Sequence, residues 1–235
     1  MANSKVQYNF YFKPLRWLAI FGALAMVYFS FCFGVASVYA SAAEKNIERW
    51  SIRPDSVTLE NVSETKTIAL KAISLQPSHP HYFNILGKIY EWEAFLKNST
   101  DRKNSLIHAK NAYLESASLR PIWPDTWADL IVVDSQLDSK NIVQYINKAD
   151  KYGPFTPKVN QTVSQIGLIN WQLFTSPQKK LALDHAARAL THPKTRGDMY
   201  RYLKSQGQLH SVCTAIVKHS RDYNKNVPLC DRFLQ

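Results

Sequence analysis

Tryptophans and charged side chains gather in the middle of the chain, where they offer the clearest binding chemistry. The group comprises Trp92, Trp123 and Trp127, with Glu91, Arg120 and Asp129 close to them in sequence. Proteins use aromatic faces combined with carboxylates and arginine to recognise carbohydrates or peptides. The candidate residues for binding a protein partner or a glycan are therefore Glu91, Trp92, Arg120, Trp123 and Asp129.

Several of these residues also have a purely structural interpretation. Arg120 and Asp129 could form an internal ion pair that fixes the turn between two helices, and we favour this over a ligand role. Trp123 follows a proline by two residues and directly precedes another, which favours packing into that turn. Trp92 is the better candidate for a surface anchor.

Catalytic and metal-binding patterns are weak. Glu91 and Glu93 are a poor acid–base dyad, because residues two apart on a helix do not face each other. We expect one of them to be partly buried and the other solvated. The histidine pairs His79–His81 and His185–His192 lack the cysteine or carboxylate spacing of a ligand set. We therefore predict a non-enzymatic protein with no catalytic, cofactor or metal site.

The three cysteines comprise one in the N-terminal apolar stretch and two near the C-terminus. Cys32 lies in a long apolar stretch, where it acts as a small apolar residue. Cys213 and Cys230 lie near the C-terminus, and an even pair in an oxidising compartment favours a disulfide. The alternative is two unpaired buried thiols.

The N-terminal stretch explains why an oxidising compartment is expected. The 27 residues from Trp17 to Ala43 carry no charge, which is enough helix to cross a bilayer. The only charges before them are Lys5, Lys13 and Arg16. The positive-inside rule then places the N-terminus in the cytoplasm and the rest of the chain in the periplasm. The sequence predicts a single-pass anchor at 17–43 after a cytoplasmic segment at 1–16.

A cleaved signal peptide is the competing interpretation of this stretch. Ala40-Ser41-Ala42 has the small-x-small form of a cleavage site. A secretory apolar region is usually about 7–15 residues long, and this one is longer. An uncleaved anchor is therefore preferred. A buried helix of a soluble protein is a third, less favoured interpretation.

The positive charge is concentrated in the C-terminal half. The chain has a formal net charge of +11, and residues 139–235 hold 15 Lys and Arg against 5 Asp and Glu. Outside the cytoplasm such a surface meets anionic lipid headgroups, anionic polysaccharide or an acidic protein rather than nucleic acid. A diffusely solvated basic face is the alternative.

Helical periodicity dominates residues 44–235, and it contains a repeat. The two openings Phe83-x2-Leu86-Gly87-x2-Tyr90 and Trp127-x2-Leu130-Ile131-x2-Asp134 lie 44 residues apart, as do the closing prolines Pro77 and Pro121. This resembles the tetratricopeptide repeat (TPR), a helix–turn–helix unit. The positions that pack in such a repeat are Phe83, Leu86, Gly87, Tyr90, Ala109, Tyr113, Trp127 and Leu130.

The repeat pattern predicts an all-α fold, with a TPR-like α-solenoid at 44–194 and a helical cap at 195–235. Trp127 is then a core residue. The polar stretch 96–104 is predicted to be a long loop inside one repeat, and Ile131, in place of glycine, predicts looser packing. Further helices are expected at 57–74, 157–174, 178–190, 195–206 and 209–221.

A more specific resemblance rests on three short motifs. They are Tyr90-Glu91-Trp92, Leu119-Arg120-Pro121-x-Trp123-Pro124-x2-Trp127-Ala128-Asp129-Leu130 and Gly153-Pro154. With the single span, they resemble the membrane-anchored TPR proteins of bacterial extracellular-polysaccharide biosynthesis systems, the VpsP type. The resemblance implies an inner-membrane, periplasmic scaffold that assists synthesis or export of a biofilm-type polysaccharide through protein partners of that system. The alternatives are a periplasmic glycan-binding module and an envelope enzyme whose site is not recognised.

Overall fold

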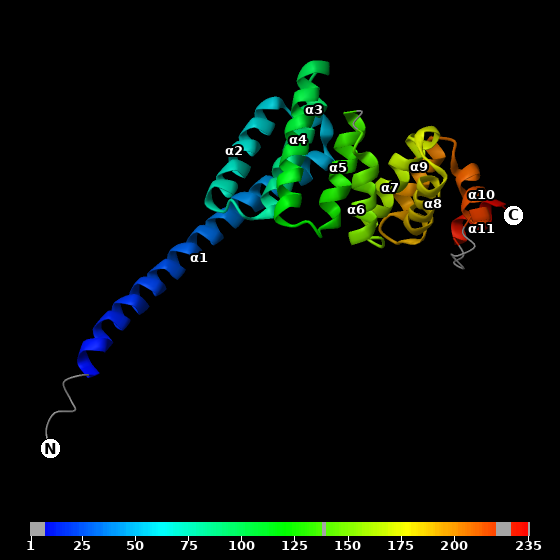
Figure 1. The fold of residues 1–235 in the computed structure, drawn as a ribbon. Helices are drawn as coiled ribbons and strands as arrows, with labels where there is room; N and C mark the ends of the chain where they lie inside the picture. Colours follow the sequence, from blue (N-terminus) through cyan, green and yellow to red (C-terminus); the bar gives the residue numbers. More distant parts are fainter. Residues whose placement is uncertain (1–7, 138–139, 220–226, 235) are drawn as a thin grey trace. The chain divides into compact units, whose positions relative to one another are not determined.

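The computed structural model describes residues 8–137, 140–219 and 227–234 (Figure 1). Every regular element in these ranges is a helix, so the predicted all-helical class is confirmed. The chain forms two compact units that divide between Ile89 and Tyr90, inside helix α3 (Pro80–Leu96). Each unit is described separately below.

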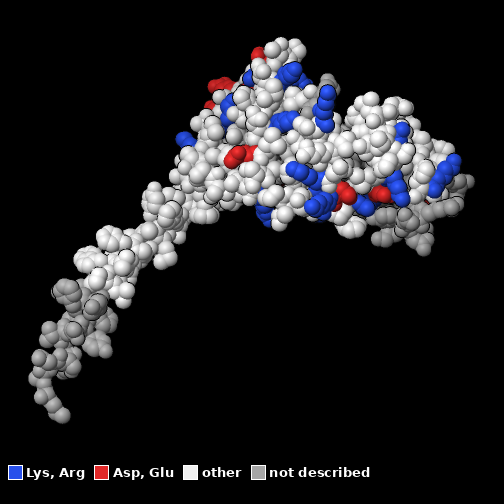
Figure 2. Space-filling view, viewed as in Figure 1, with Lys and Arg blue, Asp and Glu red and all other residues white. Residues whose placement is uncertain are grey.

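The first unit is dominated by α1 (Tyr8–Ile52), followed by a short 3-10 helix, η1 (Pro54–Ser56), and α2 (Leu59–Leu75). Within the described residues, α1 is the one helix long and apolar enough to cross a membrane, with a mean hydropathy of 2.1 over its most apolar 18-residue window. In Figure 2 the described stretch of α1 that projects from the domain is white, since it carries no charged side chain after Arg16.

The domain end of α1 packs against α2 (Figure 1). Ala36, Ala40 and Ala43 are buried on one face of α1, where their spacing of three and four residues forms a smooth stripe. Asn46 Nδ2 donates to Thr65 Oγ1 at 2.9 Å across the helix pair. Small residues thus let the two helices approach closely, and the polar pair fixes how they are aligned.

The second unit contains the end of α3 and all later helices. They are α4 (Ser99–Leu119), α5 (Pro124–Gln136), α6 (Ile142–Tyr152), α7 (Pro157–Ile169), η2 (Trp171–Leu173), α8 (Ser176–Thr191), α9 (Arg196–Ser205), α10 (Leu209–His219) and α11 (Pro228–Leu234). Helix α5 packs against α4, α6 and α7, and α7 packs against α8. Proline occupies the first position of α5 and of α7, where its missing N–H costs no helical hydrogen bond.

The predicted long loop at 96–104 is wrong. Helix α3 ends at Leu96 and α4 begins at Ser99, so most of the stretch is helical. The polar residues Asp101, Arg102 and Lys103 form the exposed first turns of α4, before the buried face begins at Ser105. Polar composition indicated a loop because these turns of the helix are exposed, and their contact with α5 is polar, through Arg102 and Gln136 at 2.7 Å.

Another boundary also differs from the prediction. The single helix expected at 157–174 ends at Ile169 and is followed by η2. The Asn170 side chain donates to the Ile166 carbonyl at 2.9 Å, which satisfies one of the last free carbonyls of α7. The predicted helices at 57–74, 178–190 and 195–206 match α2, α8 and α9 to within two residues.

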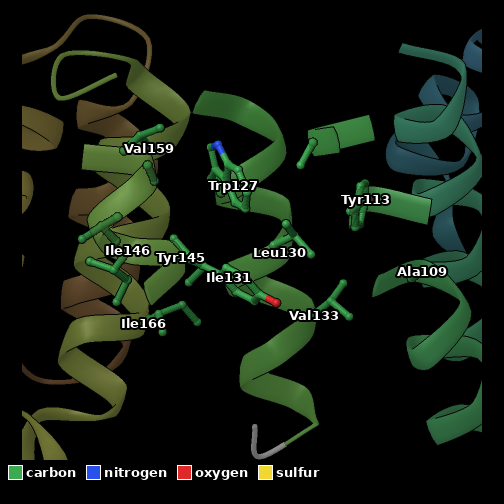
Figure 3. Packing of buried hydrophobic residues seen from close by; sticks show 14 of the residues in the cluster. Ala109, Tyr113, Trp127, Leu130, Ile131, Val133, Tyr145, Ile146, Val159 and Ile166 are labelled. Carbon is green, nitrogen blue, oxygen red and sulfur yellow. The ribbon is translucent and has the colours of Figure 1, made fainter. Parts of the chain in front are cut away.

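One hydrophobic cluster surrounds α5 (Figure 3). Trp127 is buried there, as predicted, and its Nε1 donates to the Pro121 carbonyl at 2.8 Å. Its ring stacks on Tyr145 of α6 at a centroid distance of 6.0 Å. Ile131 is fully buried in the same cluster, so a branched side chain fills the position where the repeat pattern has glycine.

In the repeat pattern, a glycine lets two helices approach closely. Such a close approach occurs between α7 and α8. A Cβ added to Gly167 of α7 would lie 2.4 Å from the Cβ of Ala182 on α8. Gly153 is similarly tight, because an added Cβ would lie 2.5 Å from Pro124 Cβ. Gly153 belongs to the Gly153-Pro154 motif of the sequence resemblance, whereas nothing in the sequence indicated a close approach at Gly167.

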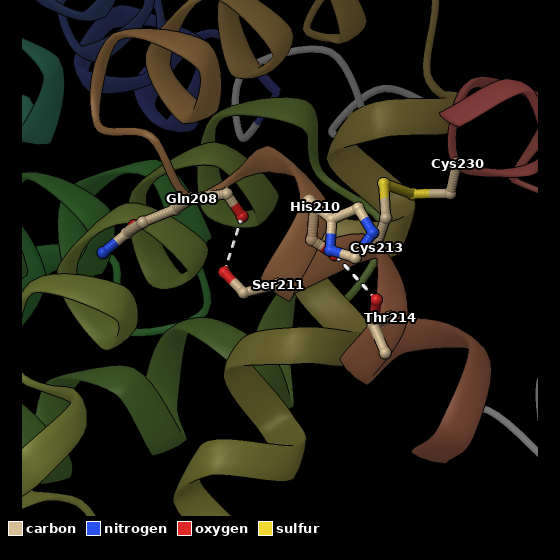
Figure 4. Close-up of a disulfide and its surroundings, with 6 residues drawn as sticks. All are labelled: Gln208, His210, Ser211, Cys213, Thr214 and Cys230. Atoms are coloured by element: carbon tan, nitrogen blue, oxygen red, sulfur yellow. Dashed lines mark hydrogen bonds between the residues drawn. A yellow bond between two sulfur atoms is a disulfide. The ribbon is translucent and has the colours of Figure 1, made fainter. Parts of the chain in front are cut away.

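A second cluster joins α8 to the C-terminal helices. It includes Leu190, Met199, Leu203 and Ile216, all buried. Cys213 of α10 and Cys230 of α11 form the predicted disulfide, with an S–S distance of 2.06 Å and a Cα–Cα distance of 5.1 Å (Figure 4). The disulfide therefore fastens the last helix to the second cluster.

Candidate functional site

The structure separates the five predicted binding residues into interior and surface positions. Glu91 of α3 and Asp129 of α5 point into polar contacts inside the second unit, whereas Arg120 and Trp123 lie at the turn between α4 and α5. The Trp92 ring meets Phe95 edge-on at a centroid distance of 5.7 Å. The five residues therefore do not form one site.

Glu91 has a structural partner. The Tyr113 hydroxyl donates a short hydrogen bond to Glu91 Oε1. Burial, reinforced by the nearby carboxylates of Glu91 and Asp129, raises the pKa of Tyr113 well above its ordinary value, so the hydroxyl stays a donor. Glu93, expected to be solvated if Glu91 was buried, pairs instead with Lys97 at 2.9 Å and is also largely covered.

The predicted ion pair between Arg120 and Asp129 is wrong. Asp129 Oδ2 accepts from Lys158 Nζ of α7 at 2.7 Å. The Arg120 guanidinium lies 4.5 Å from the centre of the Trp123 ring, a cation–π contact that packs the turn. The difference arises because Asp129 is on the buried face of α5 that meets α7, while Arg120 is exposed at the end of α4.

Helix α5 carries a second buried carboxylate, Asp134, which is the last residue of the second repeat opening. Asp134 Oδ1 accepts from Lys110 Nζ of α4 at 2.5 Å. Asp129 and Asp134 thus tie α5 to α7 and to α4. Each carboxylate is paired with a lysine rather than with another acid, which is typical of structural ion pairs and not of an acid–base dyad.

A histidine network links α6, α7 and α8. The fully buried His185 has Nδ1 2.7 Å from Asn160 Oδ1 and Nε2 3.2 Å from Asp150 Oδ1. Arg188 closes the group by donating to the Pro154 carbonyl at 2.9 Å. Burial lowers the pKa of His185, because it disfavours the imidazolium more than Asp150 stabilises it.

This network was missed from the sequence. His185 was paired with His192 as a weak metal pattern, but its partners lie 25 and 35 residues upstream. Only the packing of three helices brings them together. Within the described ranges, no group of three or more His, Cys, Asp and Glu residues is arranged to hold a metal ion.

A hollow that combines an aromatic ring with lysines lies in the basic C-terminal half, around Trp171. We call it the Trp171 groove. Its larger part has a volume of about 520 Å³ and is lined by Trp171, Pro177, Lys179, Lys180, Leu183 and His219. A second hollow of about 390 Å³ shares Trp171, Leu183 and Ala215 with it. An aromatic ring with adjacent lysines suits a ligand that has both apolar and anionic parts.

Local structure explains how these side chains come together. Asn170 ends α7, and η2 then presents Trp171 at the surface. Helix α8 begins with a reciprocal cap, in which the Thr175 backbone N–H donates to Gln178 Oε1 at 2.8 Å. That start places Lys179 in the first turns of α8, with its Nζ 5.4 Å from the Trp171 ring centre.

The surface around the groove is also apolar. Ile169 and Leu173, on either side of Trp171 in the chain, are both exposed, Leu173 at 81% of its maximum. The sequence signal was present, since Lys179 and Lys180 lie within the basic excess of residues 139–235. No protein-family model matches this chain, and no curated protein sequence resembles it significantly.

Proposed function

We propose that this protein is a membrane-anchored scaffold with a TPR-like periplasmic domain that assists the synthesis or export of an extracellular polysaccharide. The observation that carries the anchored scaffold is the continuity of α1. This helix runs without a break from an exposed apolar stretch into a domain where Ala36, Ala40 and Ala43 are buried against α2. The rest of the chain is then held at the membrane.

The same packing favours an anchor over a signal peptide. Cleavage after Ala42 would remove Ala36 and Ala40, which are among the most buried residues of α1. The retained helix would face α2 with part of its interface missing. The basic residues Lys13 and Arg16 before the span support a cytoplasmic N-terminus and a periplasmic domain.

The order in which the helices pack supports a TPR-like arrangement. Helix α5 packs against its successor α6 and against α7, the first helix of the next pair, and α7 packs against α8. Trp127 occupies the core position that the repeat opening assigns to it. Helical repeats of this kind display extended surfaces that bind segments of partner proteins.

The polysaccharide assignment rests on the sequence resemblance alone. Its most specific stretch, Arg120 to Ala128, builds the turn between α4 and α5 through the Arg120–Trp123 contact and the Trp127 hydrogen bond to Pro121. These residues therefore have a structural role that is compatible with a scaffold. A fold alone does not determine a function.

The experiment is gene deletion with matched complementation. We expect deletion to reduce cell-surface polysaccharide, and the full chain to restore it. A chain that begins at Glu44, exported by an unrelated cleaved signal peptide, should not restore it. Such a chain lacks both the span and the packing of Ala36 and Ala40 against α2. Unchanged polymer after deletion would contradict the polysaccharide role, and full rescue by the exported 44–235 chain would contradict the anchored scaffold.

A second candidate function is direct glycan binding, favoured by the Trp171 groove. Trp171 offers a ring for stacking on a sugar, and Lys179 and Lys180 offer charge for its carboxylates. The test is titration of the full chain in nanodiscs with oligogalacturonate. Trp171→Ala should abolish binding and Trp92→Ala should not. Equal loss in both variants, or no binding by the parent, would exclude the groove as a glycan site.

A further inference from the structure

The C-terminal end of α2 and the turn that follows it, residues 70–79, lie beside the point where α1 leaves the domain. Two contacts align the antiparallel pair. Asn46 meets Thr65 at 2.9 Å, and Lys71 Nζ lies 5.7 Å from the Tyr39 ring centre. Each step toward the C-terminus of α2 is therefore a step toward the N-terminus of α1, which brings Leu75 to the level of Ala36. We call residues 70–79 the proximal turn.

The free length of α1 matches the thickness of a bilayer. Every residue from Pro14 to Phe31 is exposed, and Ala36 is the first that is fully buried by the domain. At a rise of 1.5 Å per residue, the stretch from Trp17 to Val35 is about 28 Å long, close to the roughly 30 Å of a hydrocarbon core. Almost no spacer is left between the lipid and the domain, so the proximal turn comes to the level of the headgroups.

The charges along this helix pair are distributed unevenly. The acidic residues of its two helices and their connection are Glu44, Glu48, Asp55, Glu60 and Glu64, of which Glu44 pairs with His81 at 2.7 Å. From residue 65 to residue 90 the chain has no Asp or Glu, and it contains Lys66, Lys71 and Lys88. The proximal turn therefore carries Lys71 and no carboxylate, which suits a negatively charged membrane surface, whereas the distal end mixes its acids with Lys45, Arg49 and Arg53.

The side chains of the proximal turn also suit the interface between water and lipid. Leu70 is 46% exposed, and Pro77 is exposed in the turn. Lys71 and Tyr39 combine a charge with an aromatic ring, the pairing that anchors proteins at headgroup level. Burial in the headgroup layer explains why apolar residues are tolerated on this end of the unit.

We propose that the proximal turn is a membrane-contacting surface that binds anionic phospholipid headgroups and seats the domain directly on the bilayer. This inference rests on the proposed anchor, because it takes α1 as the span. It adds a lipid ligand and a contact surface that a simple tether would not have. The first unit is then held at the membrane by its span and by the proximal turn, which contacts the headgroups about one helix diameter away from α1.

The first test maps depth with spin labels on the full chain in vesicles that contain phosphatidylglycerol. Cys32 reports on the span. In a Cys32→Ala background, Ser78→Cys reports on the proximal turn and Ser56→Cys on the distal end, about 24 Å farther along α1. We expect the Ser78 label to be several-fold less accessible to a water-soluble relaxation agent than the Ser56 label.

The outcomes separate this inference from the anchor. A lipid-immersed label at Cys32 with Ser78 as accessible as Ser56 would overturn the seated domain and leave the anchor standing. A water-exposed label at Cys32 would overturn both. Immersion at Cys32 with an intermediate depth at Ser78 is the supporting result.

The second test examines the headgroup charge. In the parent chain, replacing phosphatidylcholine with phosphatidylglycerol should make the Ser78 label less accessible to the water-soluble relaxation agent. Lys71→Glu should abolish this decrease in accessibility. The matched control is Arg53→Glu, an equal charge change at the distal end, which should leave that protection intact. Protection that is the same in both lipids, or that both substitutions remove equally, would overturn specific binding of anionic headgroups.

Discussion

The two hydrophobic clusters of the second unit achieve stability by different means. The cluster around α5 contains Trp127, Tyr113 and Tyr145, and it is crossed by the ion pairs of Asp129 and Asp134. The cluster around α8 is built from smaller residues, and its outer helices α9, α10 and α11 have only 10, 11 and 7 residues. It holds a disulfide, and its aromatic rings, Trp171, Tyr200 and Tyr202, are partly buried against it rather than fully buried within it.

The difference shows what a short terminal helix requires. A buried tryptophan contributes a large apolar area, so α5 is fixed by side chains from three neighbouring helices. A seven-residue helix such as α11 buries too little surface to offset its ordering entropy, and a covalent link supplies the remainder. The cluster around α8, which carries the Trp171 groove, is therefore the one whose terminal helix, α11, depends on disulfide formation.

The largest expected effect is at Trp127. Replacing it with alanine removes a buried indole, its hydrogen bond to Pro121 and its stacking on Tyr145. We expect a loss of about 4 kcal/mol in the free energy of unfolding, measured by urea denaturation of the full chain in micelles.

The half-buried Trp92 of α3 is the control, and Trp92→Ala should cost less than Trp127→Ala. A small change at Trp127 would show that the cluster around α5 does not depend on its aromatic centre. The contrast between the two clusters would then fail.

The disulfide should come next in size. It closes a loop with a sequence separation of 17, so the paired Cys213→Ala and Cys230→Ala substitutions should cost about 3 kcal/mol. Hydrogen exchange should accelerate in α10 and α11 and stay unchanged in α5, because the lost constraint belongs to the second cluster. Cys32→Ala is the control and should alter neither helix. Faster exchange throughout α5 would mean that the clusters unfold as one.

Features of the fold that depend on local patterning were predictable from the sequence, and contacts between distant segments were not. Periodicity and prolines located α2, α8 and α9, and Trp127 was placed in the core. The disulfide followed from cysteine parity and the expected compartment. The partners of Asp129 and His185 lie on other helices, and nothing near either residue in sequence marks them. The Trp171 groove was missed for the same reason, since α7, α8 and α10 each supply part of it.

A smaller effect is expected when the lysines that pair with α5 are removed. Lys110→Met leaves the fully buried Asp134 without its cation, whereas Lys158→Met does the same to Asp129. The Lys110 side chain is 18% exposed and that of Lys158 is 40% exposed, so solvent already weakens the second pair. We expect losses of about 2 kcal/mol for Lys110→Met and about 1 kcal/mol for Lys158→Met, by urea denaturation.

The double substitutions sharpen that result. Lys110→Met combined with Asp134→Leu should recover most of the lost stability, because no buried charge is then left unpaired. Failure to recover would indicate that Asp134 has another role in the cluster around α5. Equal losses for the two single lysine variants would contradict the dependence on exposure.

The smallest effect is the response of the histidine network to acid, which tests whether α6, α7 and α8 respond together. Folding lowers the pKa of His185 below its ordinary value of 6.5, so the unfolded chain binds the proton more readily. The contribution of His185 to stability is therefore fully present above about pH 6.5 and is lost as the pH falls through the lowered folded value. The hydrogen bond from His185 also lowers the pKa of Asp150, which adds a further loss at more acidic pH.

Asp184 acts in the opposite direction, because burial raises its pKa and its ionisation above that value lowers stability. The net loss between about pH 8 and about pH 5 should nevertheless be carried by His185, the only one of the three groups whose ordinary pKa lies within that window. His185→Gln keeps a polar side chain that does not titrate, and it should flatten the urea midpoint over this range. An unchanged pH dependence in His185→Gln would place the acid sensitivity outside this network, whereas a flat profile in the parent would contradict the lowered pKa itself.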